Sequence, residues 1–183
     1  MRCLPFLAVT LLVAQAVPAL DASAATRPPA PAETAVPKSL GGAKNWSAYS
    51  AGSGKALVCY LVGKPAKTLP QHVIRGRVDA HVTHRPGENA VNVVNFELGY
   101  AAKAGSSAAL TIDGKKFALF TAKEGAWASD AATDKAITIA LSKGKEAVLR
   151  AVSEHNNAST DTYSLDGFGQ TLALIDKACN VRR

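Results

Sequence analysis

The sequence is poor in the side chains that most often carry chemistry. Its 183 residues include three cysteines, four histidines and 14 acidic residues, and aromatic residues make up 6%. It contains no C-x-x-C pair, no G-x-S-x-G nucleophile elbow and no pair of acids within an aromatic-rich stretch. These absences argue against a thiol oxidoreductase, an α/β-hydrolase and a glycoside hydrolase, respectively. A hydrolase with a scattered active site stays open as an alternative, because catalytic triads are defined by geometry.

Basic residues outnumber acidic ones, but they form no cluster. The formal net charge is +7, and the lysines and arginines are scattered among the acids. Because no basic run is interleaved with aromatic residues, we predict no nucleic-acid partner. A basic exported protein is suited to an anionic partner. The scattered charge favours a generic soluble surface, and an envelope protein or an anionic glycan is the alternative, as a partner for that surface.

The histidines do not follow the spacing of a metal site. His81 and His84 lie three residues apart in a stretch that we predict to be a strand, so their side chains would point to opposite faces. No third ligand accompanies them, and His72 and His155 are isolated. We predict no catalytic residue, no metal ligand and no cofactor.

The stretch Gly52-Ser53-Gly54-Lys55 resembles part of a phosphate-binding loop. A P-loop needs a glycine five residues before the Gly-Lys pair and a hydroxyl residue after it. Tyr49 and Ala56 occupy those two positions here. The stretch also precedes a strand-like run and not a helix, so it is predicted to be a turn.

The chain begins with the pattern of a secretory signal peptide at residues 1–24. Arg2 precedes an apolar run from about Leu4 to Val17, and Ala22-Ser23-Ala24 matches an A-x-A cleavage site. The run is short for a membrane span, so no transmembrane span is predicted after cleavage. An uncleaved N-terminal anchor is the alternative. Cleavage would place the protein in the periplasm or outside the cell.

Export decides how the cysteines are interpreted. Removal of the signal peptide also removes Cys3, which leaves Cys59 and Cys179. Two cysteines in an exported protein predict one disulfide bond. The alternative is a pair of buried free thiols.

Composition divides the rest of the chain into two parts. Residues 25–43 are rich in proline and alanine without apolar periodicity, which predicts a disordered tether. Residues 44–183 are long enough for a single β-rich domain with one core. Within it, alternating or β-branched runs predict five strands at 55–63, 77–86, 90–100, 146–153 and 160–165.

Two further patterns complete the predicted fold. Asp113-Gly114 lies between two strand-like runs and predicts a tight hairpin that brings Ile112 near Phe117. Residues 133–145 favour a helix capped by Thr133 and ended by Gly144, although a strand is possible.

The C-terminal segment is the clearest helix. Asp166 is its predicted N-cap, and one buried stripe contains Phe168, Leu172, Ile175 and Cys179. The sequence therefore predicts an α+β, β-rich fold: an antiparallel β-sandwich or partly open barrel with a C-terminal helix packed on it.

Several phrases, taken in order, resemble the invasion-associated locus B family of exported proteins from Gram-negative, largely alphaproteobacterial, bacteria. The resemblance covers nearly all of the chain after the tether. Its phrases are Trp46, Cys59, HVTHRP (81–86), GY (99–100), IDGKKFALF (112–120), AWASD (126–130), AITIALSKGKE (136–146), DTYSLDGF (161–168) and AC (178–179).

The resemblance implies a periplasmic or envelope-associated β-rich domain with no known catalytic activity. Members closest to the type that gives the family its name usually have an additional cysteine pair in mid-chain, which this sequence lacks, so a role in invasion is not carried over. We expect a non-enzymatic accessory protein. The alternative is a ligand-binding module for an anionic envelope glycan or a small apolar ligand.

Overall fold

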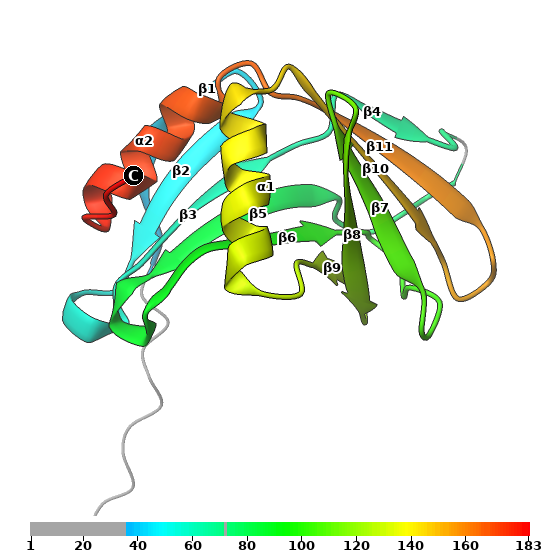
Figure 1. Ribbon diagram of the computed structural model, residues 1–183, viewed down its shortest axis with the longest axis horizontal. Coiled ribbons are helices and arrows are strands. Elements are labelled where there is room, and N and C mark those ends of the chain that lie inside the picture. The colour runs from blue at the N-terminus through cyan, green and yellow to red at the C-terminus, as the bar shows by residue number, and fades with distance from the viewer. Residues whose placement is uncertain (1–35, 72) are drawn as a thin grey trace, which may run out of the picture. The chain divides into compact units, whose positions relative to one another are not determined.

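The computed structural model describes residues 36–71 and 73–183, so the predicted signal peptide at 1–24 and His72 lie outside the described residues. The described chain forms one antiparallel sheet and two helices (Figure 1). The strands are β1 (Lys38–Ala43), β2 (Trp46–Ala51), β3 (Val58–Gly63), β4 (Lys67–Leu69), β5 (Asp79–Arg85), β6 (Ala90–Glu97), β7 (Ser107–Ile112), β8 (Lys115–Ala122), β9 (Gly125–Trp127), β10 (Glu146–Val152) and β11 (Ala158–Ser164). The helices are α1 (Ala131–Lys143) and α2 (Phe168–Ala178).

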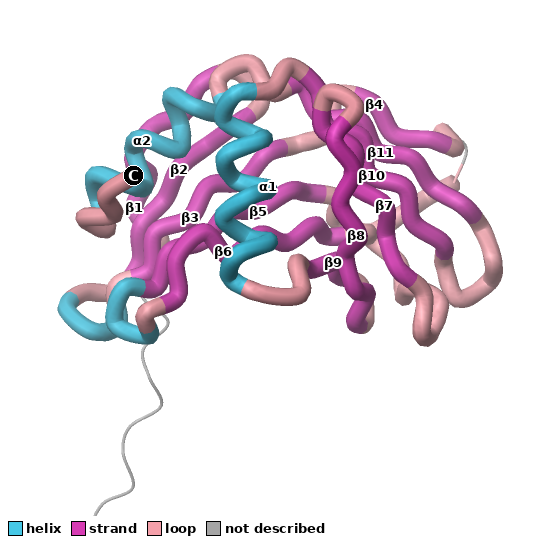
Figure 2. The backbone as a smooth tube through the Cα atoms, viewed as in Figure 1, coloured by secondary structure: helices cyan, strands magenta, loops and turns pink. Residues whose placement is uncertain are grey.

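The sheet curls without closing. Its strand order is β1-β2-β3-β5-β6-β9-β8-β7-β10-β11-β4, so β1 and β4 are its two edges (Figure 2). A hydrogen bond nevertheless connects β2 to β11, because the Trp46 indole donates to the Ser164 carbonyl at 2.9 Å. The predicted antiparallel architecture, a sandwich or partly open barrel with a C-terminal helix, is confirmed.

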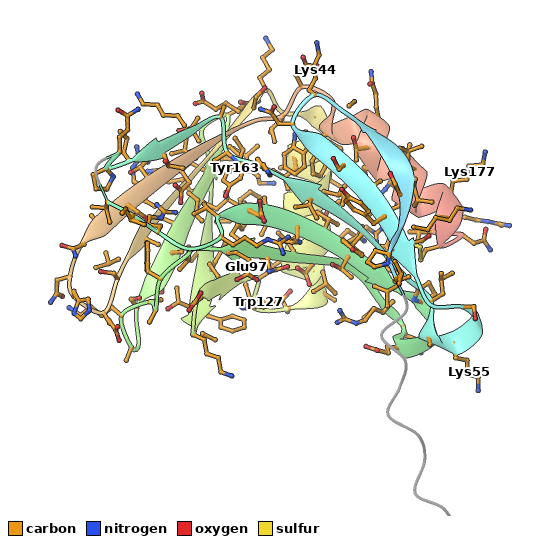
Figure 3. The ribbon with its side chains drawn as sticks, turned by 180° about the vertical axis from the view of Figure 1, so that it is seen from behind. Lys44, Lys55, Glu97, Trp127, Tyr163 and Lys177 are labelled. Atoms are coloured by element: carbon orange, nitrogen blue, oxygen red, sulfur yellow. A yellow bond between two sulfur atoms is a disulfide. The ribbon has the colours of Figure 1, made fainter. Side chains whose placement is uncertain are left out.

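Both helices lie on the same face of the sheet. α2 packs on β1, β2 and β3, whereas α1 packs on β6. Alternate strand residues therefore face the helices, and Cys59 and Leu61 of β3 are fully buried beneath α2. The opposite face of the sheet, which we call the outer face, is presented to the viewer in Figure 3.

The C-terminal helix contains the predicted apolar stripe. Phe168, Leu172, Ile175 and Cys179 are all buried. The predicted N-cap is wrong by one residue: Gly167 is the cap, with a φ of +88°. A side chain at Gly167 would overlap the backbone of Ala43, so close approach to the preceding hairpin requires glycine there. Asp166 instead lies 3.9 Å from the Lys44 ammonium.

The ambiguous segment near residue 137 is a helix, as favoured. α1 begins two residues earlier than predicted, and its N-cap is Asp130, not Thr133. The Asp130 carboxylate accepts hydrogen bonds from the Thr133 amide at 2.8 Å and from its hydroxyl at 3.0 Å. An aspartate at the cap also complements the positive end of the helix dipole. Gly144 is the C-cap.

The folded region begins earlier than the sequence predicted. Residues 38–43, assigned to the disordered tether, form strand β1 paired with β2. β1 is an edge strand interrupted by a register shift near Gly41, whose φ is +110°. Its order comes from backbone pairing and from α2 packing above it, and neither leaves an alternating apolar pattern in the sequence.

The two turn predictions are confirmed. Gly54–Ala56 forms a short 3-10 turn that precedes β3, and Asp113-Gly114 connects β7 to β8. Phe117 pairs with Leu110, which places it diagonal to Ile112 across the hairpin. The five predicted strands correspond to β3, β5, β6, β10 and β11, with bounds that differ by up to a few residues.

A buried ion pair fixes the connection between β4 and β5. Arg75 donates from its Nη1 and Nη2 to the two carboxylate oxygens of Asp161 on β11, at 3.0 and 2.7 Å. Its Nε donates to the Leu98 carbonyl at 3.1 Å. The two side chains are 6% and 0% exposed. This pair joins a long connection to the interior, so it is a main tertiary contact of the β4–β5 segment.

Candidate functional site: a basic groove on the outer face

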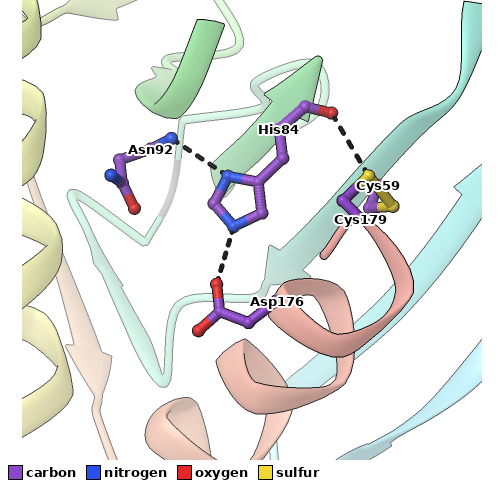
Figure 4. Close-up of a disulfide and its surroundings, with 5 residues drawn as sticks. All are labelled: Cys59, His84, Asn92, Asp176 and Cys179. Carbon is purple, nitrogen blue, oxygen red and sulfur yellow. Dashed lines mark hydrogen bonds and ion pairs between the residues drawn. A yellow bond between two sulfur atoms is a disulfide. The ribbon is translucent and has the colours of Figure 1, made fainter. Parts of the chain in front are cut away.

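The predicted site residues Cys59 and Cys179 form a disulfide. Their Cα atoms are 6.0 Å apart, and the bond joins β3 to the end of α2 (Figure 4). Both residues are buried. The predicted pairing is confirmed, and its place in the core gives it a structural role.

A histidine network lies beside this disulfide and was not predicted. His84 is opposite Cys59 in the β3–β5 register, and Asp176 is three residues before Cys179 on α2. The His84 side chain is fully buried. Its Nδ1 accepts a hydrogen bond from the Asn92 backbone amide at 3.0 Å. Its Nε2 therefore holds the proton of the neutral ring and donates to the Asp176 carboxylate at 2.9 Å.

The positions of the strand histidines agree with the sequence argument. His84 faces α2, whereas His81, three residues earlier on the same strand, belongs to the set that faces the other way. Ala80, Val82 and His84 are alternate residues of β5, so they lie on the same face of the strand. Because Ala80 and Val82 are apolar, this alternation is the sequence signal that places His84 in the interior. Only the position of α2 brings Asp176 to it.

Asp176 is ionised more easily than an ordinary aspartate. Burial opposes its charge, but hydrogen bonds from His84 and Arg183 outweigh burial and lower its pKa. The Arg183 guanidinium donates to it at 2.5 and 2.8 Å. A lowered pKa means that this carboxylate stabilises the fold above its unfolded-state pKa, and that the contribution is lost as the pH falls through the folded-state value.

We expect Asp176→Asn to lower the free energy of unfolding by about 1–3 kcal/mol at neutral pH, because the partly buried carboxylate loses the charge that strengthens its hydrogen bonds with His84 and Arg183. The difference from the unmodified protein should shrink in strong acid, where Asp176 is protonated in both states. Urea denaturation at neutral and acid pH measures it. Asp166→Asn, which changes an exposed acid just before α2, is the matched control. If Asp176→Asn lowered the free energy of unfolding equally at neutral and acid pH, the role assigned to Asp176 would be contradicted.

A wide hollow lies on the outer face. Its volume is about 700 Å³, and it is lined by β2, β3, the start of β5 and the turns beside them. The lining residues are Tyr49, Tyr60, Val62, Lys64, Pro65, Arg77, Val78 and Asp79. A second hollow of about 240 Å³ shares Tyr49, Val62 and Lys64 with it and adds Lys44, Asn45 and Ser47. We call the two adjoining hollows the basic groove.

The charges that the groove presents to solvent are mainly positive. Arg77 pairs with Asp79, and this hydrogen bond raises the pKa of the guanidinium. The arginine side chain is 66% exposed but the aspartate only 5%, so the cation is the outward member of the pair. Lys44 is 68% exposed. Lys64 has no ion-pair partner among the residues that the structure describes.

Two tyrosines form the floor of the groove. Tyr49 and Tyr60 are cross-strand partners, and their rings stack with centroids 5.4 Å apart. Next to them, His81 is half-buried, and burial followed by the charge of Arg77 lowers its pKa. A neutral His81 adds no charge of its own to the groove near neutral pH. The arrangement therefore combines cations with hydroxyl and amide groups, which suits binding to an anionic, polar molecule.

Within residues 36–71 and 73–183, no group of three or more His, Cys, Asp or Glu side chains is arranged to hold a metal ion. In the same residues, neither helix is long and apolar enough to cross a membrane.

The family described as "Invasion associated locus B (IalB) protein" matches residues 46–176. The match covers most of the chain and includes ten of the eleven strands, both helices up to Asp176, and Cys59. Neither a curated protein nor a solved structure matches the chain.

Proposed function

Because this chain belongs to the invasion-associated locus B family, we propose that it is a non-enzymatic accessory protein, exported to the periplasm or cell envelope of a Gram-negative bacterium, that acts by binding through its surface. The observation that carries the proposal is the buried Cys59–Cys179 disulfide. A bond of this kind forms in oxidising compartments outside the cytoplasm. The signal-like pattern at residues 1–24 supplies the route there.

The distribution of chemistry supports binding over catalysis. The two strand histidines are engaged or half-buried, and His84 uses both ring nitrogens in internal hydrogen bonds. Lys44 and Arg77, two cations of the basic groove, are about two-thirds exposed. They can attract a charged partner, but they do not form the nucleophile, base and oxyanion donor that a hydrolase requires.

The proposal is tested by expressing the full chain in a Gram-negative host and separating periplasm, membranes and cytoplasm. We expect a shortened chain in the periplasmic or membrane fraction, with its new N-terminus near residue 25. Mass spectrometry without reductant should find the Cys59 and Cys179 peptides linked. A full-length cytoplasmic chain with two alkylated thiols would contradict the proposal. A matched chain lacking residues 2–24 is the control for leakage and should stay in the cytoplasm.

A ligand-binding module is a second candidate, and the basic groove specifically favours it. An anionic glycan fits this groove better than a small apolar ligand, because the lining carries three cationic side chains and several hydroxyl or amide groups.

A further inference from the structure

We propose that the basic groove binds an extended anionic glycan, such as a polymer of uronic acid units, across β2, β3 and the start of β5. This inference rests on the proposed function and gives it a site and a ligand class. It is carried by the arrangement of Lys44, Lys64 and Arg77, by the burial of the nearby acid, and by the polar groups between the cations.

The cations form a series, not a single cluster. Lys64 lines both hollows, Arg77 lines only the larger one, and Lys44 lines only the smaller one. A free phosphate or carboxylate would need several donors converging on one point. Cations distributed along a continuous groove instead match charges repeated along a chain, so the ligand is a polymer and not a single small anion.

Acidic groups oppose this charge only weakly. Asp79 is nearly buried under Arg77. Glu97 of β6 also contributes to the field at Arg77 and accepts a hydrogen bond from Asn95 at 3.0 Å. Asp166 is exposed and lies 3.9 Å from the Lys44 ammonium, a separation that is long for an ion pair. An exposed pair of this kind exchanges readily for a ligand carboxylate, because it is worth little in water.

The remaining lining favours sugar over nucleic acid. Asn45, Ser47 and the tyrosine hydroxyls provide donors and acceptors that suit sugar hydroxyl groups. Recognition of single-stranded nucleic acid depends on open aromatic faces on which bases stack. Tyr49 and Tyr60 stack on each other, so each ring covers one face of its partner. The groove therefore offers more hydrogen bonding than stacking surface.

The test is a calorimetric titration of the exported, oxidised chain with oligogalacturonates of increasing length. We expect affinity to rise with length until the oligomer spans both hollows, and to fall as salt is added. Lys44→Gln/Lys64→Gln should weaken binding by about fivefold to tenfold, as expected for two solvent-exposed charge contacts. Neutral dextran oligomers of matched length should show no comparable binding.

Lys135→Gln/Lys177→Gln is the matched control. It removes the same charge from exposed positions on α1 and α2, on the other face of the sheet (Figure 3 labels Lys44 and Lys177). It should leave the affinity within about twofold of the original. Both variants should have the same melting temperature as the unmodified protein, because all four lysine side chains are exposed.

Three results would overturn the inference: equal losses in the two double variants, absence of oligogalacturonate binding, or equally tight binding of single-stranded DNA of matched charge. The first would mean that only net charge matters, and the last would indicate a general polyanion site. An exported, disulfide-bonded chain that fails to bind the glycan would remove this inference alone. A cytoplasmic, reduced chain would remove the proposed function whatever the titration gives.

Discussion

Replacing both disulfide cysteines, as Cys59→Ala/Cys179→Ala, should lower the free energy of unfolding by about 4–5 kcal/mol. The bond closes a loop with a sequence separation of 120 residues, and this constraint reduces the entropy of the unfolded chain. For a domain of this size the loss corresponds to a fall in melting temperature of roughly 10–20 °C. Thermal and urea denaturation under non-reducing conditions measure both quantities.

Reductant provides the internal control for this prediction. Adding dithiothreitol to the unmodified protein should reproduce most of the loss, whereas the double alanine variant should not respond to it. Both cysteines are buried, so alanine also removes packing of the sulfur atoms, and this part of the loss should not be reproduced by reductant. Superimposable melts of the oxidised protein and the variant would contradict the structural role of the bond.

The second large effect is expected at the buried ion pair of the β4–β5 connection. Arg75→Met should destabilise the protein by about 3–5 kcal/mol at neutral pH, because it leaves the Asp161 carboxylate charged and without its partner in the interior. Arg85→Met is the matched control. Its partner Glu88 is exposed, so the same substitution there should cost at most about 1 kcal/mol.

The dependence on pH identifies the cause. Burial raises the pKa of Asp161, although hydrogen bonding and the charge of Arg75 act to lower it. Loss of the arginine should raise this pKa further. A carboxyl group with a raised folded-state pKa favours folding below its unfolded-state pKa and loses that contribution as the pH rises through the folded-state value. The deficit of Arg75→Met should therefore be smallest in acid and largest near neutrality.

A double variant separates the unpaired charge from the lost packing. Arg75→Met/Asp161→Asn removes both charges, so it should recover much of the stability lost in the single variant at neutral pH. Arg75 also lies 5.2 Å from the centre of the Tyr100 ring, and the methionine side chain retains part of that packing. A loss that is the same at every pH and persists in the double variant would show that packing, and not charge, holds this connection.

Local sequence patterns were a good guide wherever an element is determined by its own residues. The Asp113-Gly114 turn and the stripe of α2 are examples, since turn geometry and helical periodicity act over a few neighbours. β1 was missed because an edge strand is ordered by its partner, so its residues carry no pattern of their own. The predicted N-cap was misplaced by three residues in α1 and by one in α2, because several nearby residues could fill the same role.

The sequence by itself determined the disulfide pair, the β-rich class, the turns and the family, because each depends on residue identity and order along the chain. Only the tertiary structure decided the rest. Lys44, Lys64 and Arg77 line one groove because β2, β3 and β5 are adjacent, and Arg75 meets Asp161 across 86 positions. Contacts between residues so distant in sequence depend on how the whole sheet curls, which no short stretch of residues specifies.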